Sequence, residues 1–482
     1  MVSALLAIIS GATLSCAFAP IDQWWLAPIA IAIFLYSVTK TRRSYLVAFI
    51  FGLTFNLLTL SWSGRYVGVI PWAILSILES LFFIPLGFIS WKRERFSRIF
   101  LLPPVYLLME LMRTHYPFGG FGWNRIAFSQ ADAPYADVVR FISTSGLTLL
   151  TLYFGIAVYL LFSKPHSWAL VSIIILITLC ISIPNSALIG KPFDVLAIQG
   201  NVPRPGLNFN ARATEVFNLH VQQTLRSVSH QTQLPDVIVW PENAVDVDPY
   251  SNPSVGLTIT KIVDEFRTPL IFGAVLHHTG VLQNASILWN PDQGSGSIYI
   301  KRHLTPFGEY MPLRTLAEIV SPYAKDVADF TPSNEIVTHR VNEAVIGPVI
   351  CFELIDDGAV RTMSAASNFL LVQTNSATFA DTAESEQQLD ITRIRAMEND
   401  RYAVSISTTG VSAFVTSSGH VYKKSSVDIA QSLQGTVQLA PVDSQTPSNR
   451  VGGYFPLINL GTSLGLYGLS RRRKEILTSA DK

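Results

Sequence analysis

The most constraining feature of this sequence is a series of long apolar stretches before Pro184. A helix needs roughly 20 apolar residues to cross a hydrocarbon core of about 30 Å. We identify seven such stretches: Val2–Ala19, Trp24–Thr39, Tyr45–Ser63, Val67–Trp91, Ile99–Arg113, Val138–Phe162 and Trp168–Pro184. An eighth, Tyr454–Ser470, is followed directly by the basic run Arg471–Lys474. Any single short stretch could instead be a buried helix of a soluble core, but the series predicts a membrane domain of about eight transmembrane helices.

The composition agrees with that prediction. Of the 482 residues, 49% are hydrophobic and only 14% are charged, against about 25% charged in typical soluble domains. The net charge of +1 argues against a disordered chain and against a basic nucleic-acid binder. The cysteines, Cys16, Cys180 and Cys351, are too few for a disulfide framework. A core, a bilayer or both must therefore supply the stability.

The charges divide the chain into regions of different character. Residues 194–450 contain 17 Lys and Arg but 26 Asp and Glu, a net charge of −9, whereas the remainder carries +10 and holds the apolar stretches. We therefore expect a membrane domain over residues 1–190, a second domain over 191–452, and a final helix with a basic tail over 453–482.

The short loops predict the orientation, because cytoplasmic loops carry an excess of Lys and Arg. With the N-terminus inside, the inner loops hold the basic residues at 40–43, 92–98, 164 and 471–474, while the outer short loops hold only Arg65, Arg113 and Arg125. Both termini are then cytoplasmic and the 191–452 domain is extracytoplasmic. The first stretch lacks the basic start of a cleaved signal peptide, so we expect it to remain as a span.

The second domain shows short β-rich runs alternating with helical patterns. We expect strands at Asp194–Gln199, Val237–Trp240, Leu270–Val275, Ser286–Trp289, Ser297–Ile300, Ala344–Phe352, Phe369–Thr374, Tyr402–Thr408, Ser412–Val415 and His420–Tyr422. We expect helices at Arg212–Val228, Val255–Phe266, Asp357–Ala366 and Ser385–Asp400. This alternation is typical of a layered α/β domain.

Three of the expected strands end in a chemically reactive side chain. Glu242 follows the strand at 237–240, Lys301 follows the strand at 297–300, and Cys351 lies at the end of the run Val345–Ile350. Taken singly, a buried structural cysteine, a helix-start carboxylate and a solvated lysine are the more ordinary interpretations. Together they form a chemical unit, because a carboxylate can accept a thiol proton and an ammonium group stabilises both a thiolate and a tetrahedral oxyanion. A Cys/His pair is the alternative, with His220, His277, His278 and His303 as the available histidines.

This set of residues resembles the nitrilase, or carbon–nitrogen hydrolase, superfamily. With the spans on either side, the chain is similar to the apolipoprotein N-acyltransferase family. The resemblance extends over nearly the whole chain and includes Gln199–Val202, Trp240–Glu242, Lys301–Pro312, Ile350–Glu353, Gln373–Asn375 and Arg393–Glu398. It implies an extracytoplasmic α-β-β-α sandwich domain joined to the membrane domain.

The resemblance also implies roles for individual residues. It makes Cys351 the nucleophile, Glu242 the general base and Lys301 the cation that stabilises the oxyanion. Glu309 matches a second essential carboxylate, and Glu353 matches a further required position, with a structural acid as the alternative. In an extended chain residues 351 and 353 share a face, whereas a helix starting there would separate them.

The implied reaction transfers an acyl chain from a membrane phospholipid, through a Cys351 thioester, to the α-amino group of a diacylglyceryl-modified apolipoprotein cysteine. The implied location is the bacterial cell membrane, and the expected protein is a monomer without metal, cofactor or nucleic acid. A membrane-tethered nitrilase-type amidase that uses water as acceptor, and a non-enzymatic scaffold, are the alternatives.

Two positions differ from the family pattern, and two further features lie outside the family motifs. Phe352 stands where many members have Tyr, and Thr378 stands where many have Trp. We therefore expect the contacts that bind the acyl donor and the acyl acceptor to differ. The loop Tyr116–Asn124 fits either a lipid entrance or an interfacial aromatic anchor. Glu79 lies near the middle of an apolar stretch, which favours a functional polar contact or a buried structural one.

Overall fold

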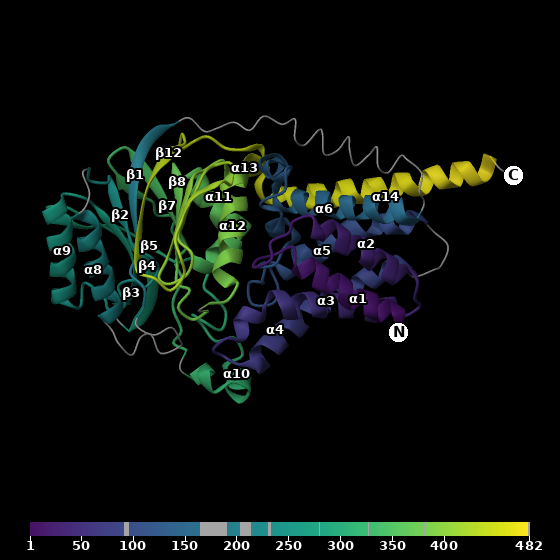
Figure 1. Ribbon diagram of the computed structural model, residues 1–482, viewed down its shortest axis with the longest axis horizontal. Coiled ribbons are helices and arrows are strands. Elements are labelled where there is room, and N and C mark those ends of the chain that lie inside the picture. Colours follow the sequence, from purple (N-terminus) through teal and green to yellow (C-terminus); the bar gives the residue numbers. More distant parts are fainter. Residues whose placement is uncertain are drawn as a thin grey trace. The chain divides into compact units, whose positions relative to one another are not determined.

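The computed structural model describes residues 1–90, 96–163, 190–202, 214–229, 233–278, 280–325, 327–379 and 381–480. The chain divides into two compact units (Figure 1). The first, here called the helical unit, comprises Met1–Gly64, Gly68–Pro184 and Arg450–Lys482. The second, here called the sandwich unit, comprises Arg65–Val67 and Asn185–Asn449.

The described part of the helical unit consists of α-helices joined by short 3₁₀ turns. The α-helices are α1 (Val2–Ser15), α2 (Leu26–Thr39), α3 (Ser44–Thr59), α4 (Val69–Leu81), α5 (Leu102–Arg113), α6 (Val139–Ser163) and α14 (Phe455–Ala480). The 3₁₀ helices are η1 (Ser61–Gly64), η2 (Ile84–Ser90), η3 (Phe96–Leu101), η4 (Ile126–Gln130), η5 (Ala136–Val138) and η9 (Gly452–Tyr454). The short helix α13 (Pro447–Val451) lies where the two units join along the chain.

Each described apolar stretch contains an α-helix, but the helices are shorter or more broken than expected. The span expected over Val67–Trp91 is present but is not a regular α-helix throughout: α4 ends at Leu81 and the 3₁₀ helix η2 follows. Pro85 explains the break, because its ring clashes with the carbonyl group four residues earlier. Two segments, Val69–Ile89 and Ala136–Ser163, are long and apolar enough to cross a membrane. The stretch Trp168–Pro184 lies outside the described residues.

A buried ion pair lies inside the helical unit. Glu79 on α4 and Arg113 on α5 are each 1% exposed, and Arg113 Nε lies 3.4 Å from Glu79 Oε2. Arg113 also donates a hydrogen bond to Asn124, whose amide donates to Asn56 on α3 over 2.7 Å. The polar side chain near the middle of α4 is therefore part of a network that ties three helices to the loop ending at Asn124.

Strand order in the sandwich unit defines two sheets of six strands. The first has the order β12-β1-β2-β3-β4-β5 and the second has the order β11-β10-β9-β8-β7-β6. The strands of the first sheet are β1 (Lys191–Gln199), β2 (Val237–Val239), β3 (Leu270–His278), β4 (Val281–Asn290), β5 (Gly294–Ile300) and β12 (Gln431–Leu439). Those of the second are β6 (His339–Val341), β7 (Ala344–Ile350), β8 (Phe369–Thr374), β9 (Ala403–Ser407), β10 (Ala413–Val415) and β11 (Val421–Lys424). The inner pairs β1–β2, β2–β3, β7–β8 and β8–β9 are parallel.

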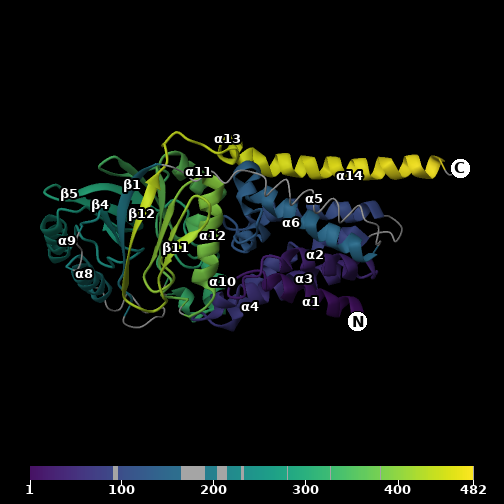
Figure 2. The same ribbon diagram turned by 45° about the horizontal axis from the view of Figure 1, so that its top comes forward.

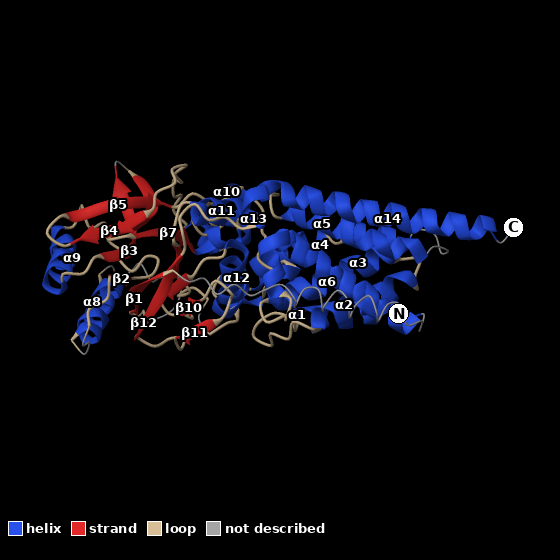
Figure 3. Cartoon of the chain, turned by 90° about the horizontal axis from the view of Figure 1, so that it is seen from above, coloured by secondary structure: helices blue, strands red, loops and turns tan. Residues whose placement is uncertain are grey.

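Helices cover the outer face of each sheet, so the layers are α-β-β-α (Figures 1, 2 and 3). Helices α8 (Glu215–Val228) and α9 (Pro253–Phe266) lie on the first sheet, and α11 (Asp357–Ala365) and α12 (Glu384–Asn399) lie on the second. The residues of β1 show why each sheet is covered on both faces, because successive side chains of a strand point to opposite faces of its sheet. Val195 and Ala197 pack against the second sheet, whereas Leu196 and Ile198 pack toward the helices.

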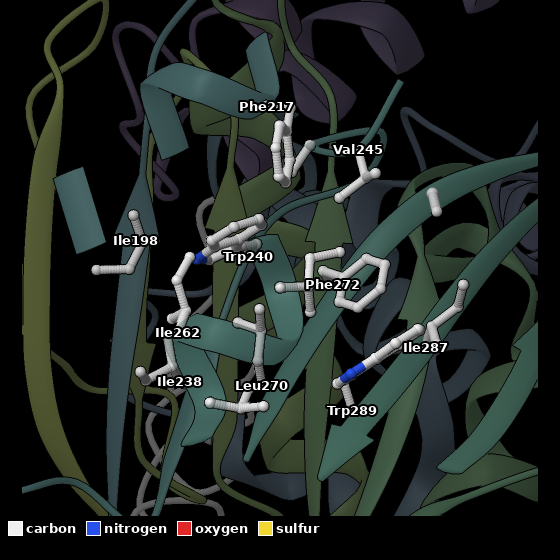
Figure 4. Close-up of a cluster of buried hydrophobic side chains, with 14 of the residues drawn as sticks. Ile198, Phe217, Ile238, Trp240, Val245, Ile262, Leu270, Phe272, Ile287 and Trp289 are labelled. Carbon is white, nitrogen blue, oxygen red and sulfur yellow. The ribbon is translucent and has the colours of Figure 1, made fainter. Parts of the chain in front are cut away.

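The core beneath α8 and α9 is built around large aromatic side chains (Figure 4). Trp240 is fully buried against Phe217 and Phe272, and its indole N–H donates to Thr224 Oγ1 over 3.0 Å. A buried Trp with a satisfied N–H combines a large apolar contact with a fixed orientation. It therefore anchors the chain two residues before Glu242.

Most of the expected elements of this unit are present. The strands and longer helices that the sequence did not predict are β6, β12 and α10 (Arg314–Val320), and the 3₁₀ helix η7 (Pro322–Lys325) is also additional. The expected strand Ala344–Phe352 is too long, because β7 ends at Ile350 and Cys351 begins the 3₁₀ helix η8 (Cys351–Ile355). Residues 351 and 353 therefore do not share the face of an extended strand.

The Glu79–Arg113 pair makes a direct prediction about stability. Glu79→Leu leaves the Arg113 guanidinium buried without its carboxylate, which costs about 3–5 kcal/mol. The double variant Glu79→Leu/Arg113→Met removes both charges and should recover most of that loss. Melting temperatures of the purified protein in detergent measure both effects. A double variant that is no more stable than Glu79→Leu alone would contradict this interpretation.

Candidate active site

The first reactive group, Glu242, is held close to strand β3. After β2 the chain passes through Pro241, and the Trp240 carbonyl accepts a hydrogen bond from Gln373 Nε2 of the second sheet over 2.8 Å. At Gly273 a Cβ atom would lie only 2.6 Å from the Glu242 Cα. Glycine at 273 thus allows the backbone of Glu242 to lie directly against β3. The carboxylate is 5% exposed.

Lys301 lies directly after β5 and brings two carboxylates together. Its Nζ is 2.7 Å from Glu309 Oε2 and 3.4 Å from Glu242 Oε1. The lysine is 1% exposed, and both glutamates are also buried. One buried cation therefore holds two carboxylates.

The lysine gives the two carboxylates different pKa values. Burial raises the pKa of Glu242, and the attraction of Lys301 does not offset this. Burial acts on Glu309 in the same direction, but the charge of the closer Lys301 and the hydrogen bonds from Lys301, Asn284 and the Thr305 N–H together outweigh it and lower the pKa of that carboxyl. Burial alone would lower the pKa of Lys301, yet the charges of Glu309 and Glu242 raise it. Of the two carboxyl groups, Glu309 therefore holds its negative charge more firmly, and Glu242 takes up a proton more readily.

Asn284 is a site residue that the sequence did not reveal. From the middle of β4 its Nδ2 donates to Glu242 Oε1 and to Glu309 Oε1, both over 2.7 Å. It is 1% exposed. A lone Asn before the expected strand Ser286–Trp289 gave no clear signal, because only the fold brings it to the two carboxylates. It fixes both groups in one orientation.

Cys351 is presented by a sharp turn at the end of β7. Its φ of 48° is a left-handed conformation that is uncommon for a residue with a side chain and often occurs at active sites. The residue is partly exposed, and Gln388 Nε2 lies 3.8 Å from its Sγ. Removal from water and the charge of Glu242 raise the pKa of the thiol well above its ordinary value, while Lys301 acts to lower it. The resting group is therefore a thiol that needs a base.

Glu353 links the two strand ends that carry Cys351 and Lys301. One of its carboxylate oxygens accepts from the Arg302 N–H over 2.7 Å and from the Tyr299 hydroxyl over 2.8 Å. The other accepts from the Ile350 N–H over 2.8 Å. Glu353 is 1% exposed. Its contacts are those of a positioning residue that holds the residue before the nucleophile next to the residue after the lysine.

The histidines of the Cys/His alternative make other contacts. His220 is buried and its Nδ1 lies 2.8 Å from the Val216 carbonyl, while His303 Nδ1 lies 3.6 Å from Asp356 Oδ2. In the described residues no hydrogen bond joins His220, His277 or His303 to Cys351, and the side chain of His278 is not described. Within the described part of the chain, the charged groups that act on the thiol include Glu242 and no histidine.

A further buried carboxylate, Glu384, lies at the start of α12. It is 2% exposed, and its charge acts on the thiol of Cys351. The sequence did not single it out. Among the described residues no group of three or more His, Cys, Asp or Glu side chains is placed to hold a metal ion.

Comparison with known proteins agrees with the two-part organisation. The model of the apolipoprotein N-acyltransferase N-terminal domain matches residues 10–157, and the carbon–nitrogen hydrolase model matches residues 220–445. The apolipoprotein N-acyltransferase of Mycolicibacterium smegmatis is 31% identical over 454 residues, covering 86% of this chain and 76% of that protein. This chain belongs to the apolipoprotein N-acyltransferase family.

A more distant relative matches almost the full length of the chain. The apolipoprotein N-acyltransferase of Coxiella burnetii is 25% identical over 487 residues, covering 95% of this chain and 98% of that protein. Within the family's carbon–nitrogen hydrolase region, residues 220–445, lie all five residues that the sequence predicted for the site. Asn284 and Glu384 lie in the same region.

The charges around the thiol predict opposite shifts in two variants. Glu242→Gln removes a negative charge that raises the pKa of Cys351, so the thiol should ionise at lower pH. Lys301→Met removes the positive charge and should move ionisation to higher pH. The pH dependence of iodoacetamide alkylation, measured with Cys16 and Cys180 replaced by Ala, reports both shifts. A Glu242→Gln thiol that ionises at the same or higher pH would refute this assignment.

Asn284 gives a second prediction. Asn284→Leu removes one buried hydrogen-bond donor from each carboxylate, at about 1–3 kcal/mol for each lost partner. We expect acyl-transfer activity to fall roughly ten- to hundredfold, with the fold retained as judged by circular dichroism. Asn290→Leu, at the last residue of β4, is the matched control and should retain activity. Equal activity of the two variants would show that Asn284 does not orient the site.

Proposed function

We propose that this enzyme transfers an acyl chain from a membrane phospholipid to the α-amino group of a diacylglyceryl-modified apolipoprotein cysteine, through a thioester on Cys351. The observation that carries the proposal is the buried Lys301 ammonium between Glu242 and Glu309, in a chain of the apolipoprotein N-acyltransferase family. We assign Cys351 as nucleophile, Glu242 as general base and Lys301 as the oxyanion-stabilising cation.

The first half-reaction forms the thioester. Glu242 takes the thiol proton as the Cys351 sulfur attacks the ester carbonyl carbon of the phospholipid. Negative charge develops on the carbonyl oxygen and is stabilised by the Lys301 ammonium, which Glu309 keeps charged. The ester C–O bond then breaks, and Glu242 returns the proton to the departing lysophospholipid alkoxide.

The second half-reaction uses an amine in place of the alkoxide. The neutral α-amino group attacks the thioester carbonyl, with Lys301 again stabilising the oxyanion. Glu242 accepts a proton from the attacking nitrogen and returns it to the Cys351 sulfur as the C–S bond breaks. The products are the amide and the free thiol, so the enzyme is restored without any added reductant or oxidant.

A membrane location fits both substrates, because both carry lipid chains. Large apolar side chains are exposed along α1, α4 and α14 of the helical unit, including Ile8, Ile74 and Leu464, which are 46%, 48% and 49% exposed. Such surfaces are costly in water and favourable in lipid. We propose that the helical unit lies in the cell membrane with both termini cytoplasmic, and that the sandwich unit is extracytoplasmic, as the loop charges predict.

Intact-mass spectrometry tests the reaction. We expect purified enzyme incubated with phospholipid to gain the mass of one acyl chain, and to lose it when a diacylglyceryl-cysteine peptide is added. Cys351→Ala should gain nothing, because it lacks the nucleophile. Cys16→Ala is the matched control and should behave as the unmodified protein.

Two outcomes would contradict the proposal. Loss of the acyl group to water, with the peptide unmodified, would favour the amidase-like hydrolase instead. Acylation that persists in Cys351→Ala would assign the nucleophile to another residue.

A further inference from the structure

The second half-reaction leaves one proton without an assigned acceptor. An α-amino group is largely an ammonium ion at neutral pH, since its pKa is roughly 7.7–8.0. It must lose one proton before it can attack and a second during attack. Glu242 accepts the second and passes it to the Cys351 sulfur, so another group must accept the first.

The charged groups around the thiol limit which residue can accept the first proton. The charged groups that act on Cys351 are Glu242, Lys301, Glu384 and Glu309. Lys301 is already protonated, and Glu309 is committed to Lys301 at 2.7 Å and to the Thr305 N–H at 2.7 Å. Because Glu242 accepts the second proton, Glu384 is the one group of these four that remains to accept the first.

Glu384 is a buried carboxyl group with one oxygen left open to a cation. It is 2% exposed, and its Oε2 has no hydrogen-bond partner among the described residues. Its neighbour Ser376, on the loop after β8, donates a hydrogen bond to the carboxylate. A buried carboxylate with one unpaired oxygen is costly unless it is protonated or paired with a cation.

Glu384 lies on the same face of α12 as a residue close to the nucleophile. Residues four apart on a helix lie on the same face, and Gln388, four residues after Glu384, has its Nε2 3.8 Å from Cys351 Sγ. The charges of Glu242 and Glu384 also act on each other. Glu384 therefore lies on the face of α12 that borders the thiol.

We propose that Glu384 binds the ammonium group of the acceptor and takes its first proton. This inference rests on the acyl transfer proposed above and adds a binding subsite to it. Before the acceptor binds, the buried Glu384 carboxyl holds a proton at neutral pH. The positive charge of the bound ammonium group favours the carboxylate, so that proton leaves to water, and the step then converts R–NH₃⁺ and the Glu384 carboxylate to R–NH₂ and the carboxylic acid. The neutral amine then attacks the thioester, and Glu384 later releases its proton to water.

The acidity of Glu384 suits this step. Burial, partly offset by the Ser376 hydrogen bond and reinforced by the charge of Glu242, raises the pKa of Glu384 to about 8. That value is close to the pKa of an α-ammonium group, roughly 7.7–8.0. A proton can then pass between the two groups at little cost in free energy.

Measuring the two half-reactions separately tests the assignment. Glu384→Gln should form the Cys351 thioester at the unmodified rate, but transfer it to the peptide about tenfold more slowly at pH 7, where roughly a tenth of the amine is neutral. The deficit should disappear near pH 9. Hydroxylamine, largely uncharged at neutral pH, should discharge both thioesters equally fast.

Three results would contradict the assignment of Glu384 as the ammonium-binding subsite. Slower thioester formation in Glu384→Gln, an equal transfer deficit at pH 7 and 9, or slower discharge by hydroxylamine would each show a general defect. If the unmodified enzyme forms the thioester but never acylates the peptide, the proposed function fails instead, which distinguishes the two claims.

Two further variants serve as controls. Glu386→Gln removes a carboxylate from the same helical turn, where Glu386 pairs with Lys424 at 2.8 Å on the surface, and should leave both half-reactions unchanged. If Glu384→Gln does not fold, Glu384→Asp keeps the carboxylate but withdraws it by one methylene. It should slow transfer at pH 7 without slowing thioester formation, and the opposite pattern would refute the proposal.

The pH dependence of stability gives a readout that does not involve substrate. The pKa of Glu384 is about 8 in the folded protein, against 4.5 for an unperturbed Glu. The folded state therefore holds the proton more tightly, and stability is lost as the pH rises from about 4.5 to 8. The melting temperature of Glu384→Gln relative to the unmodified protein should rise between pH 5 and pH 8. A constant difference would contradict the protonated carboxyl.

Discussion

The chemistry of this site depends on one buried cation held by two carboxylates. A buried ammonium is stable only with a partner, and Lys301 has one at 2.7 Å in Glu309 and a second at 3.4 Å in Glu242. The closer carboxylate is thereby fixed as an anion. The more distant one keeps a raised pKa and can act as a base. The shorter distance to Lys301, together with the hydrogen bond from the Thr305 N–H, thus gives two chemically identical side chains opposite pKa shifts.

The α-β-β-α sandwich makes this arrangement possible. Glu242 and Lys301 follow strands of the first sheet, whereas Cys351 follows a strand of the second. The contacts of Glu353 with the Ile350 and Arg302 N–H groups bridge the two sheets at this edge. The rigid layers therefore hold the reacting groups in place before any substrate binds, which reduces the reorganisation that catalysis requires.

Much of this could be predicted from local sequence. The helical and strand patterns gave most elements, since hydrophobic periodicity reports directly on burial. The strand-end positions of Glu242, Lys301 and Cys351 suggested a site, and the family resemblance added Glu309 and Glu353. The catalytic roles of these residues remain predictions.

The parts that could not be predicted depend on contacts between distant segments. Strand β12 pairs with β1 more than 200 residues earlier in the chain. Its residues alternate between buried and more exposed from Leu433 to Leu439, a local signal that the sequence analysis did not use. Asn284 and Glu384 are ordinary polar residues in a strand and at a helix start. Only the fold places Asn284 against two carboxylates and Glu384 beside the thiol. The turn at Cys351 was missed because the apolar run before it continues into Phe352.

A structure of the acyl-enzyme, prepared with phospholipid in the absence of acceptor, would test the central claim most directly. The account predicts an acyl chain bonded to Cys351 Sγ, with its carbonyl oxygen within hydrogen-bonding distance of Lys301 Nζ and Lys301 still paired with Glu309. A carbonyl oxygen turned away from Lys301, or an acyl chain on a different residue, would contradict the roles assigned here.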